Sequence, residues 1–71
     1  MDRTQVISTQ LASIGYDPAT LTLEVEFRKG GVYQYIGVPE ETHQQLMTAE
    51  SIGTLFNTMI RESGFTYVRV G

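Results

Sequence analysis

Apolar and polar residues alternate most regularly between residues 21 and 27. One set of positions holds Leu21, Leu23, Val25 and Phe27, and the other holds Thr22, Glu24 and Glu26. Because successive side chains of a β-strand point to opposite faces, this alternation predicts a strand with one apolar face and one polar face. A sheet built from such strands packs its core on one face and leaves the other open to water.

Three further segments favour strands by their β-branched and aromatic content, namely residues 11–16, 32–38 and 65–70. Gly15 within the first of them indicates a bulge or a close approach of backbone. Asp17 followed by Pro18 predicts the turn that leads into residues 21–27. The glycines of Arg28-Lys29-Gly30-Gly31 predict a hairpin connection to residues 32–38.

Two short helices are predicted between the third and the last strand. Pro39 with Glu40 and Glu41 suits a helix N-terminus, so we expect a helix over residues 39–49. Its inward residues are Leu46, Met47 and Ala49. The second helix has Ser51 as its N-cap and Gly64 at its end. Its core stripe is Ile52, Leu55, Phe56, Met59 and Ile60.

The predicted order of elements is therefore β-β-β-α-α-β. It corresponds to a two-layer α+β domain, an antiparallel meander sheet with two short helices packed on one face. With 71 residues the chain forms one domain, residues 1–71, with a small core. Residues 1–9 are polar and expected to be loosely ordered, with Val6-Ile7 available to join a sheet edge.

The hairpin register decides which face carries the two tyrosines Tyr33 and Tyr35. If Phe27 pairs with Val32, both tyrosines lie on the polar face. If Phe27 pairs with Gly31 across a three-residue loop, both lie on the apolar face, with Gly30 in the left-handed conformation. We favour the second register, because it keeps the charged residues together on the outer face.

The overall charge and composition exclude several functional classes. The net charge of −3 argues against strong non-specific binding of nucleic acid, which needs clustered Lys and Arg. There is no cysteine, and no apolar run approaches the length of a membrane span. The first residues lack the apolar run of a signal peptide, so we expect a cytoplasmic protein without membrane contact.

No catalytic or cofactor motif is present. His43 is the only histidine, and we interpret it as a surface residue without the partners that a metal site requires. Asp17, His43 and Ser51 include the residue types of a hydrolytic triad, but a Gly-x-Ser-x-Gly elbow is missing. We therefore predict a protein that is not an enzyme and binds neither a metal nor a cofactor.

Several stretches together resemble the KTSC domain. They are Ile14-Gly15-Tyr16-Asp17, Leu23 to Phe27, Gly31-Val32-Tyr33-Gln34-Tyr35 with Val38-Pro39, Ala49-Glu50-Ser51-Ile52-Gly53, Phe56-Asn57 and Ile60-Arg61. The chain is similar to the small bacterial proteins that consist of this domain alone. The family is named for a domain at the C-terminus of some lysyl-tRNA synthetases, and that association implies weak binding of single-stranded RNA or tRNA.

The RNA hypothesis assigns roles to a small set of residues. Tyr33 and Tyr35 carry the central motif of the resemblance and would stack with bases, with Tyr67 as a further candidate. The cations expected to contact phosphate are Arg28, Lys29 and Arg61. Ser51 and Asn57 are expected to form the edge of a polar pocket next to the tyrosine hydroxyls.

A protein-interaction module is the alternative hypothesis. An exposed sheet edge, with apolar Val32 and Ile36 on the outer face, would pair with a partner protein or with a second copy by strand addition. Salt distinguishes the two hypotheses, because binding to RNA weakens steeply as salt rises whereas an apolar interface does not.

Overall fold

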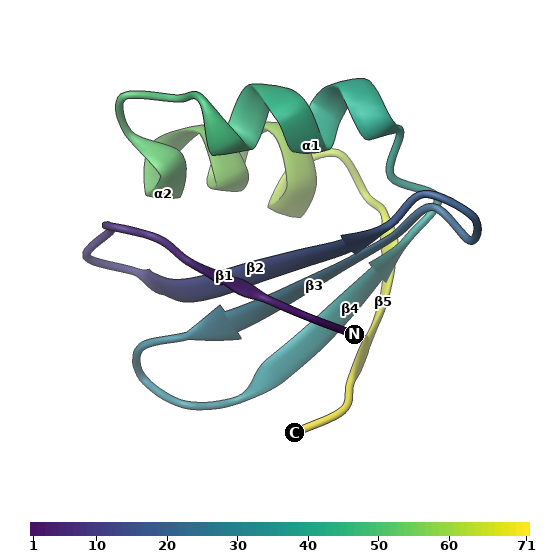
Figure 1. The fold of residues 1–71 in the computed structure, drawn as a ribbon, viewed down its shortest axis with the longest axis horizontal. Coiled ribbons are helices and arrows are strands. Elements are labelled where there is room, and N and C mark those ends of the chain that lie inside the picture. Colours follow the sequence, from purple (N-terminus) through teal and green to yellow (C-terminus); the bar gives the residue numbers. More distant parts are fainter.

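The computed structural model describes residues 1–71 and confirms the α+β class (Figure 1). The strands are β1 (Thr4–Gln5), β2 (Leu11–Asp17), β3 (Thr22–Phe27), β4 (Val32–Ile36) and β5 (Thr66–Arg69). The helices are α1 (Glu40–Met47), α2 (Ile52–Phe56) and the π-helical η1 (Asn57–Arg61), which continues α2 directly.

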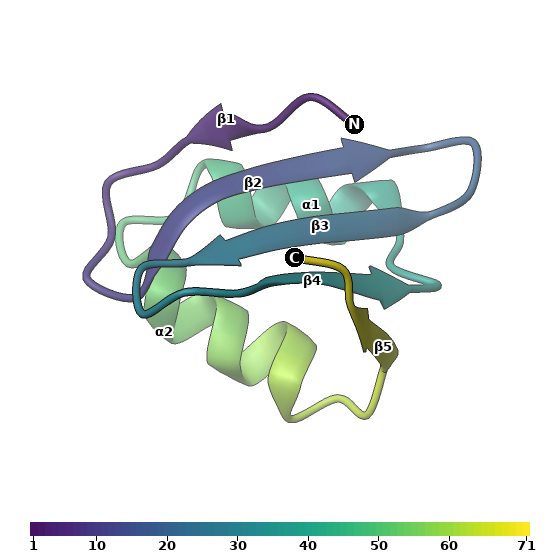
Figure 2. The same cartoon turned by 90° about the horizontal axis from the view of Figure 1, so that it is seen from below.

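The sheet is antiparallel throughout, with its strands in the order β1-β2-β3-β4-β5. All helices lie on one face of the sheet, and the chain returns from η1 to place β5 beside β4 (Figures 1 and 2). We call the helix-covered face the inner face and the opposite one the outer face.

The β3–β4 hairpin has the register that we favoured. Val25 pairs with Tyr33, and the Phe27 N–H donates to the Gly31 carbonyl at 3.1 Å. Both glycines of the connection adopt positive φ, 112° at Gly30 and 94° at Gly31, so the bend uses two glycines where we expected one. The register places both tyrosines of β4 on the inner face, on the same side as Val25.

The core lies between the inner face and the helices. Its buried residues are Val6, Leu11, Ile14, Leu23, Val25, Tyr35, Val38, Leu46, Phe56 and Ile60. The stripe predicted for the second helix supplies Phe56 and Ile60 to this core, with Ile52, Leu55 and Met59 packed against it. Side-chain burial on this face is the main favourable term for folding such a small chain.

Two strands are shorter than the alternation predicted. Leu21 does not continue the apolar face of β3, because its φ of 55° turns the chain and leaves the side chain exposed. Its carbonyl accepts the N–H groups of Gly37 and Val38 at 3.0 and 2.9 Å. Gly37 has a φ of 84° and ends β4 at Ile36. Turn chemistry, which side-chain alternation does not report, therefore sets both strand ends.

We expected the outer face to be open to water, but part of it is covered. Glu24 in β3 is only 7% exposed, and Arg3 Nη1 donates to its Oε2 at 2.7 Å. A Cβ added to Gly15 would lie 2.6 Å from the Asp2 carbonyl oxygen, so the N-terminal segment crosses the sheet in close contact there. The expected close approach at Gly15 is confirmed, and this segment is what covers part of the polar face.

Part of the N-terminal segment, residues 4 to 6, pairs with the sheet, whereas Ile7 is 99% exposed. Thr4 and Gln5, rather than Val6-Ile7, form the edge strand β1, and Val6 is buried in the core. Its N–H donates to the Ala12 carbonyl at 3.1 Å. The sequence offered no apolar pattern for this pairing, because the contacts of residues 3 to 5 are made by backbone and by charge.

Candidate functional site

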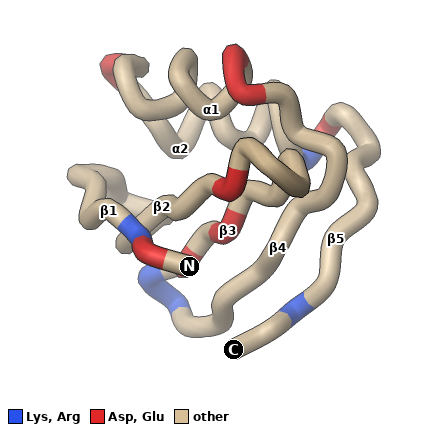
Figure 3. Tube along the Cα trace, turned by 45° about the vertical axis from the view of Figure 1, so that its right-hand side comes forward, with Lys and Arg blue, Asp and Glu red and all other residues tan.

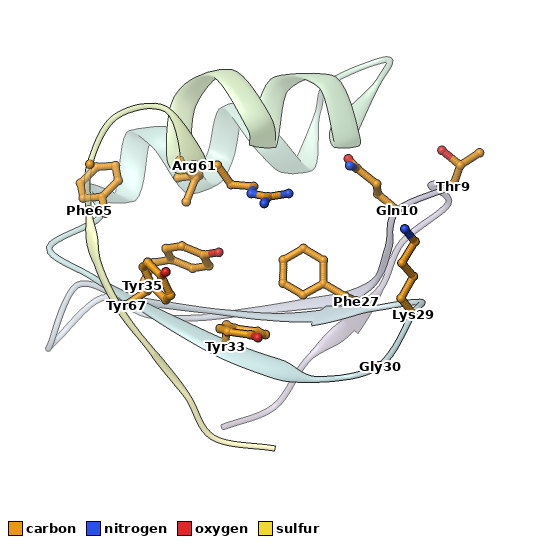
Figure 4. A pocket seen from close by; sticks show the side chains of 12 residues that line it. Thr9, Gln10, Phe27, Lys29, Gly30, Tyr33, Tyr35, Arg61, Phe65 and Tyr67 are labelled. Carbon is orange, nitrogen blue, oxygen red and sulfur yellow. The ribbon is translucent and has the colours of Figure 1, made fainter.

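A cavity of about 580 Å³ opens between the inner face of the sheet and the end of the second helix. Its lining residues are Thr9, Gln10, Phe27, Lys29, Gly30, Tyr33, Tyr35, Ile60, Arg61, Gly64, Phe65 and Tyr67. Figure 4 shows the aromatic rings of the sheet on one side of this cavity and Arg61 on the helical side. The volume is in the range of small-molecule binding sites, ~300–1,000 Å³.

The three tyrosines on this side of the sheet differ greatly in accessibility. Tyr35 is 6% exposed and packs edge-on against Phe56, with the ring centroids 5.6 Å apart. Tyr67 is 61% exposed, and its ring lies 5.5 Å from Tyr35 and 6.1 Å from Tyr33, which is half-buried. The pair Tyr33–Tyr35 is thus not a two-ring stacking platform. Tyr35 belongs to the core, and the accessible rings are Tyr67 and Tyr33.

Phe27, Tyr33, Tyr35 and Tyr67 form the aromatic wall of the cavity. Phe27 anchors this wall to the core. Its ring meets Tyr33 edge-on at 5.5 Å and Phe56 at 5.7 Å. Edge-to-face pairs of this kind contribute about 0.5–1.5 kcal/mol each beyond the area they bury. The aromatic wall is therefore held in place before any ligand arrives.

The lining carries two cations and no anion. Lys29 comes from the β3–β4 hairpin and Arg61 from the last turn of η1, and no Asp or Glu lines the cavity. The basic residues are spread along the chain in Figure 3, so it is the fold that brings these two to one place. The cavity is a positively charged site in a chain whose net charge is −3.

The nearest acids along the sheet face away from this cavity. Glu24 and Glu26 lie on the outer face, where Ser13 Oγ donates to Glu26 Oε1 at 2.9 Å and Gln34 Nε2 to Glu24 Oε1 at 2.9 Å. These bonds join them in a polar network with Arg3. The hydrogen bond from Gln34, together with Arg3, lowers the pKa of Glu24 against the opposing effect of burial. The negative charge of β3 is therefore compensated on the far side of the sheet.

The π-helical turn explains how Arg61 reaches the cavity. In an α-helix, with 3.6 residues per turn, Arg61 would lie about 140° around the axis from the buried Phe56. In η1 the Glu62 N–H instead donates to the Asn57 carbonyl at 3.0 Å, an i→i+5 bond that widens the turn. The residue five positions after Phe56 then returns to the sheet-facing side. In Figure 4 the Arg61 side chain extends below the helix toward the tyrosines.

Arg61 also acts electrostatically on the core tyrosine. Burial raises the pKa of the Tyr35 phenol, and the positive charge of Arg61 partly offsets that increase. The positive charge of Arg61 therefore acts on the phenol of Tyr35 as well as on the cavity.

The remaining predicted cation, Arg28, lies outside the cavity. Its Nε donates to the Ser8 carbonyl and its Nη2 to the Val6 carbonyl, so it ties the hairpin to the N-terminal loop. Arg69, which we did not assign, lies with its Cζ 5.9 Å from the centre of the Tyr33 ring. This distance is in the range of a cation–π contact.

Ser51 and Asn57 do not lie beside the tyrosine hydroxyls. They line a separate polar cavity of about 380 Å³ between residues 7–10 and the start of α2. Asn57 Nδ2 donates to Gln10 Oε1 at 3.3 Å, and Ser51 Oγ donates to the Thr54 hydroxyl rather than accepting a backbone N–H as a cap. A Cβ added to Gly53 would lie 2.9 Å from Gln10 Oε1, which explains the glycine. Asn57 therefore holds this loop to the helix, whereas Ser51 bonds within the start of the helix itself.

His43 is half-buried rather than a free surface residue. Its ring stacks on Tyr16 with the centroids 4.7 Å apart, and burial lowers the pKa of its imidazole. The Tyr16 hydroxyl donates to the Val38 carbonyl. No group of three or more His, Cys, Asp and Glu residues is placed to hold a metal ion, and no helix is both long enough and apolar enough to cross a membrane.

Phe65 lines the cavity although the sequence suggested no role for it, and Tyr67 was only a further stacking candidate without a place in the fold. Pairing β5 against β4 puts Tyr67 opposite Tyr35 and therefore on the inner face. The parity of residues 65–70 could have located it once β5 was assumed to pair with β4. The exposure of Tyr67 follows from its place on the edge strand, which only the fold shows.

Comparison with known proteins identifies the family of this chain. The sequence profile of the KTSC domain matches residues 7–65. The crystal structure of a KTSC domain protein from Yersinia pestis is 44% identical, with a TM-score of 0.93 over 99% of this chain and 97% of that one. An uncharacterized protein from Stutzerimonas stutzeri is 41% identical over 70 residues, which is 99% of both chains.

Two lysine–tRNA ligases contain a related region. The enzyme of a Nostoc species is 39% identical over 46 residues and that of Nostoc punctiforme 37% identical over 51 residues. These alignments span 65% and 72% of this chain but only 8% and 9% of the ligases. The similarity therefore concerns a small part of each ligase.

Proposed function

The chain belongs to the KTSC domain family, and from this premise we propose that it is a non-enzymatic module that binds unpaired nucleotides of RNA in its aromatic cavity. The observation that carries the proposal is the composition of the lining, in which accessible aromatic rings stand beside two cations and no acid. Aromatic rings stack with bases, and cations compensate the phosphates.

Two further observations support an RNA ligand. The acids of β3 lie on the outer face, so they do not oppose a phosphate that approaches the tyrosines. Two relatives of this chain are enzymes named for joining lysine to tRNA. Stacking supplies about 1–3 kcal/mol per base, so a site with one or two accessible rings binds weakly and tolerates different sequences.

Fluorescence anisotropy of a labelled single-stranded RNA in a salt series tests the proposal. With Lys29 and Arg61 as phosphate contacts, log Kd should rise with log salt with a slope of about 1.4, twice the ~0.7 of a single contact. A duplex of the same sequence should bind much more weakly, because paired bases offer no free faces. The proposal fails if neither the single strand nor tRNA binds at millimolar protein.

Matched variants locate the binding. Arg61→Gln and Arg28→Gln change the net charge equally, but only Arg61 lines the cavity, whereas Arg28 binds carbonyls of the N-terminal loop. Arg61→Gln should weaken RNA binding several-fold and reduce the salt dependence, and Arg28→Gln should leave both near wild type. Equal effects of the two variants would indicate non-specific attraction to positive charge.

Interaction with a protein, or with a second copy, is the second candidate, and the exposure of β5 is what favours it. This strand pairs only with β4, so its other backbone edge is free, and all four of its residues are exposed. Val68 and Val70 are exposed apolar residues in addition to Ile36. Val32 is only half-exposed, because the backbone of Val70 and Gly71 bonds to it. Complexes formed by strand addition at this edge should be nearly indifferent to salt. Sedimentation or light scattering at low and high salt separates this candidate from RNA binding.

A further inference from the structure

The lining residues of the cavity span a short distance, which limits how much of a ligand they contact at once (Figure 4). Gly64 and Phe65, on the connection from η1 to β5, form one end, and Gln10 with Gly30 forms the other. In Figure 4 the connection that carries Phe65 and the loop that carries Gln10 stand at opposite sides of the space. A volume of about 580 Å³ lies within the range of sites for one small molecule, so it suits a single nucleotide rather than several.

The two ends of the cavity differ in chemistry. Phe65 and Tyr67 stand at one end, and Gln10 and Lys29 stand at the other (Figure 4). Arg61 extends from the helical side into the space between them. A ligand that fits this arrangement is flat and aromatic at one end and anionic at the other, as a nucleotide with its own phosphate is.

The charge of the lining distinguishes a terminal phosphate from an internal one. Lys29 and Arg61 form no ion pair, since the one salt bridge of the chain joins Arg3 to Glu24. A phosphodiester carries a single negative charge, whereas a phosphomonoester carries about −1.5 to −2 at pH 7 and three acceptor oxygens. Two cations with no acid beside them match the phosphomonoester. The planar guanidinium accommodates two of its oxygens and the ammonium acts as a point charge.

We infer, on the basis of the proposed function, that the cavity binds a single nucleotide bearing a terminal phosphomonoester. The base lies against Tyr67, and the phosphate lies between Lys29 and Arg61. The same chemistry is offered by the phosphorylated end of an RNA strand and by a free mononucleotide. Internal nucleotides of a strand offer the base but not the second negative charge.

A set of ligands that differ only at their ends tests this inference. Tetra-adenylate RNA is prepared with a 5′-phosphate, with a 3′-phosphate and with hydroxyls at both ends, and AMP and inorganic phosphate are tested beside them. A charge-assisted hydrogen bond gained at one end corresponds to roughly tenfold in affinity. We therefore expect one phosphorylated tetramer to bind about tenfold more tightly than the tetramer with two hydroxyl ends. If AMP binds as tightly as that tetramer, the natural ligand is the free nucleotide.

Three variants with the same change in charge assign the effect to the cavity. Lys29→Gln and Arg61→Gln should each abolish the preference for the phosphorylated end. Arg28→Gln should retain it, since that side chain is bonded to the Ser8 carbonyl. The ¹⁵N spectrum of each variant shows whether it is folded, so a loss of preference is not confused with a loss of structure.

The possible outcomes separate the inference from the function it rests on. Equal binding of phosphorylated and hydroxyl tetramers overturns the single-nucleotide inference and leaves RNA binding in place. A phosphate preference that survives in both Lys29→Gln and Arg61→Gln overturns it as well. If no tetramer binds at millimolar concentration, the proposed function fails first.

Discussion

Removal of the Tyr67 ring is the sharpest perturbation of the cavity. The side chain is 61% exposed on the edge strand, where its ring pairs with Tyr33 and Tyr35, so Tyr67→Ala should leave the core intact. The variant loses two tilted aromatic pairs, which corresponds to a stability change on the order of 1 kcal/mol. Its effect on RNA binding should be larger than its effect on folding.

The magnitude follows from the stacking that the ring supplies. One base stacked on one ring is worth about 1–3 kcal/mol, which is roughly 5- to 150-fold in Kd. Fluorescence anisotropy with a labelled single-stranded RNA measures the ratio, and thermal denaturation confirms that the variant is folded at the assay temperature. Tyr67→Phe keeps the ring and should stay within about threefold of wild type if stacking is the source of the affinity.

The adjacent Val68 provides a matched control. It is also exposed on β5 but lies on the outer face, where it pairs with Gln34. Val68→Ala should leave RNA binding unchanged. The reasoning is refuted if folded Tyr67→Ala binds RNA as wild type does, or if Val68→Ala weakens binding equally.

Three predictions concern the scaffold. Phe56→Ala empties a fully buried position and should lower the free energy of unfolding by about 3–5 kcal/mol in urea titration; a smaller loss would show that the core collapses around the gap. Because the pKa of Glu24 is lowered in the folded state, the stability it contributes is complete above the ordinary glutamate pKa of about 4.3 and is lost as pH falls through its lower folded pKa. The melting temperature of Glu24→Gln should therefore depend less on pH in that window, and an unchanged profile would contradict this. Gly15→Ala places a Cβ 2.6 Å from the Asp2 carbonyl oxygen, so exchange of the Val6 amide should accelerate; protection equal to wild type would mean that the N-terminal segment adapts without opening.

The layers and the hairpin register could be predicted because each is set by local signals. The alternation from Leu23 to Phe27 defines one apolar face, and glycines at positions 30 and 31 allow the hairpin that places Tyr33 on that face. The helical stripe ending at Ile60 is likewise a local pattern. Patterns of this kind report which side of an element is buried.

Features that depend on distant contacts could not be predicted in this way. The burial of Glu24 requires Arg3, which lies 21 positions away in the sequence, and no periodicity connects them. The π turn that directs Arg61 inward arises within an apolar stripe that reads equally well as an α-helix. The assignment of Arg28 to phosphate binding followed from its place at the hairpin tip, whereas its hydrogen bonds join it to the Ser8 carbonyl.

Chemical-shift mapping tests the central claim most directly, namely that RNA binds on the inner face of the sheet. Isotope-labelled protein is titrated with single-stranded RNA at low and moderate salt. The account predicts shifts centred on Tyr33, Arg61 and Tyr67 that fade as salt rises, with Glu24 and Gln34 on the outer face unaffected. Shifts confined to the outer face or to the free edge of β5, or no shifts at millimolar RNA, would contradict it.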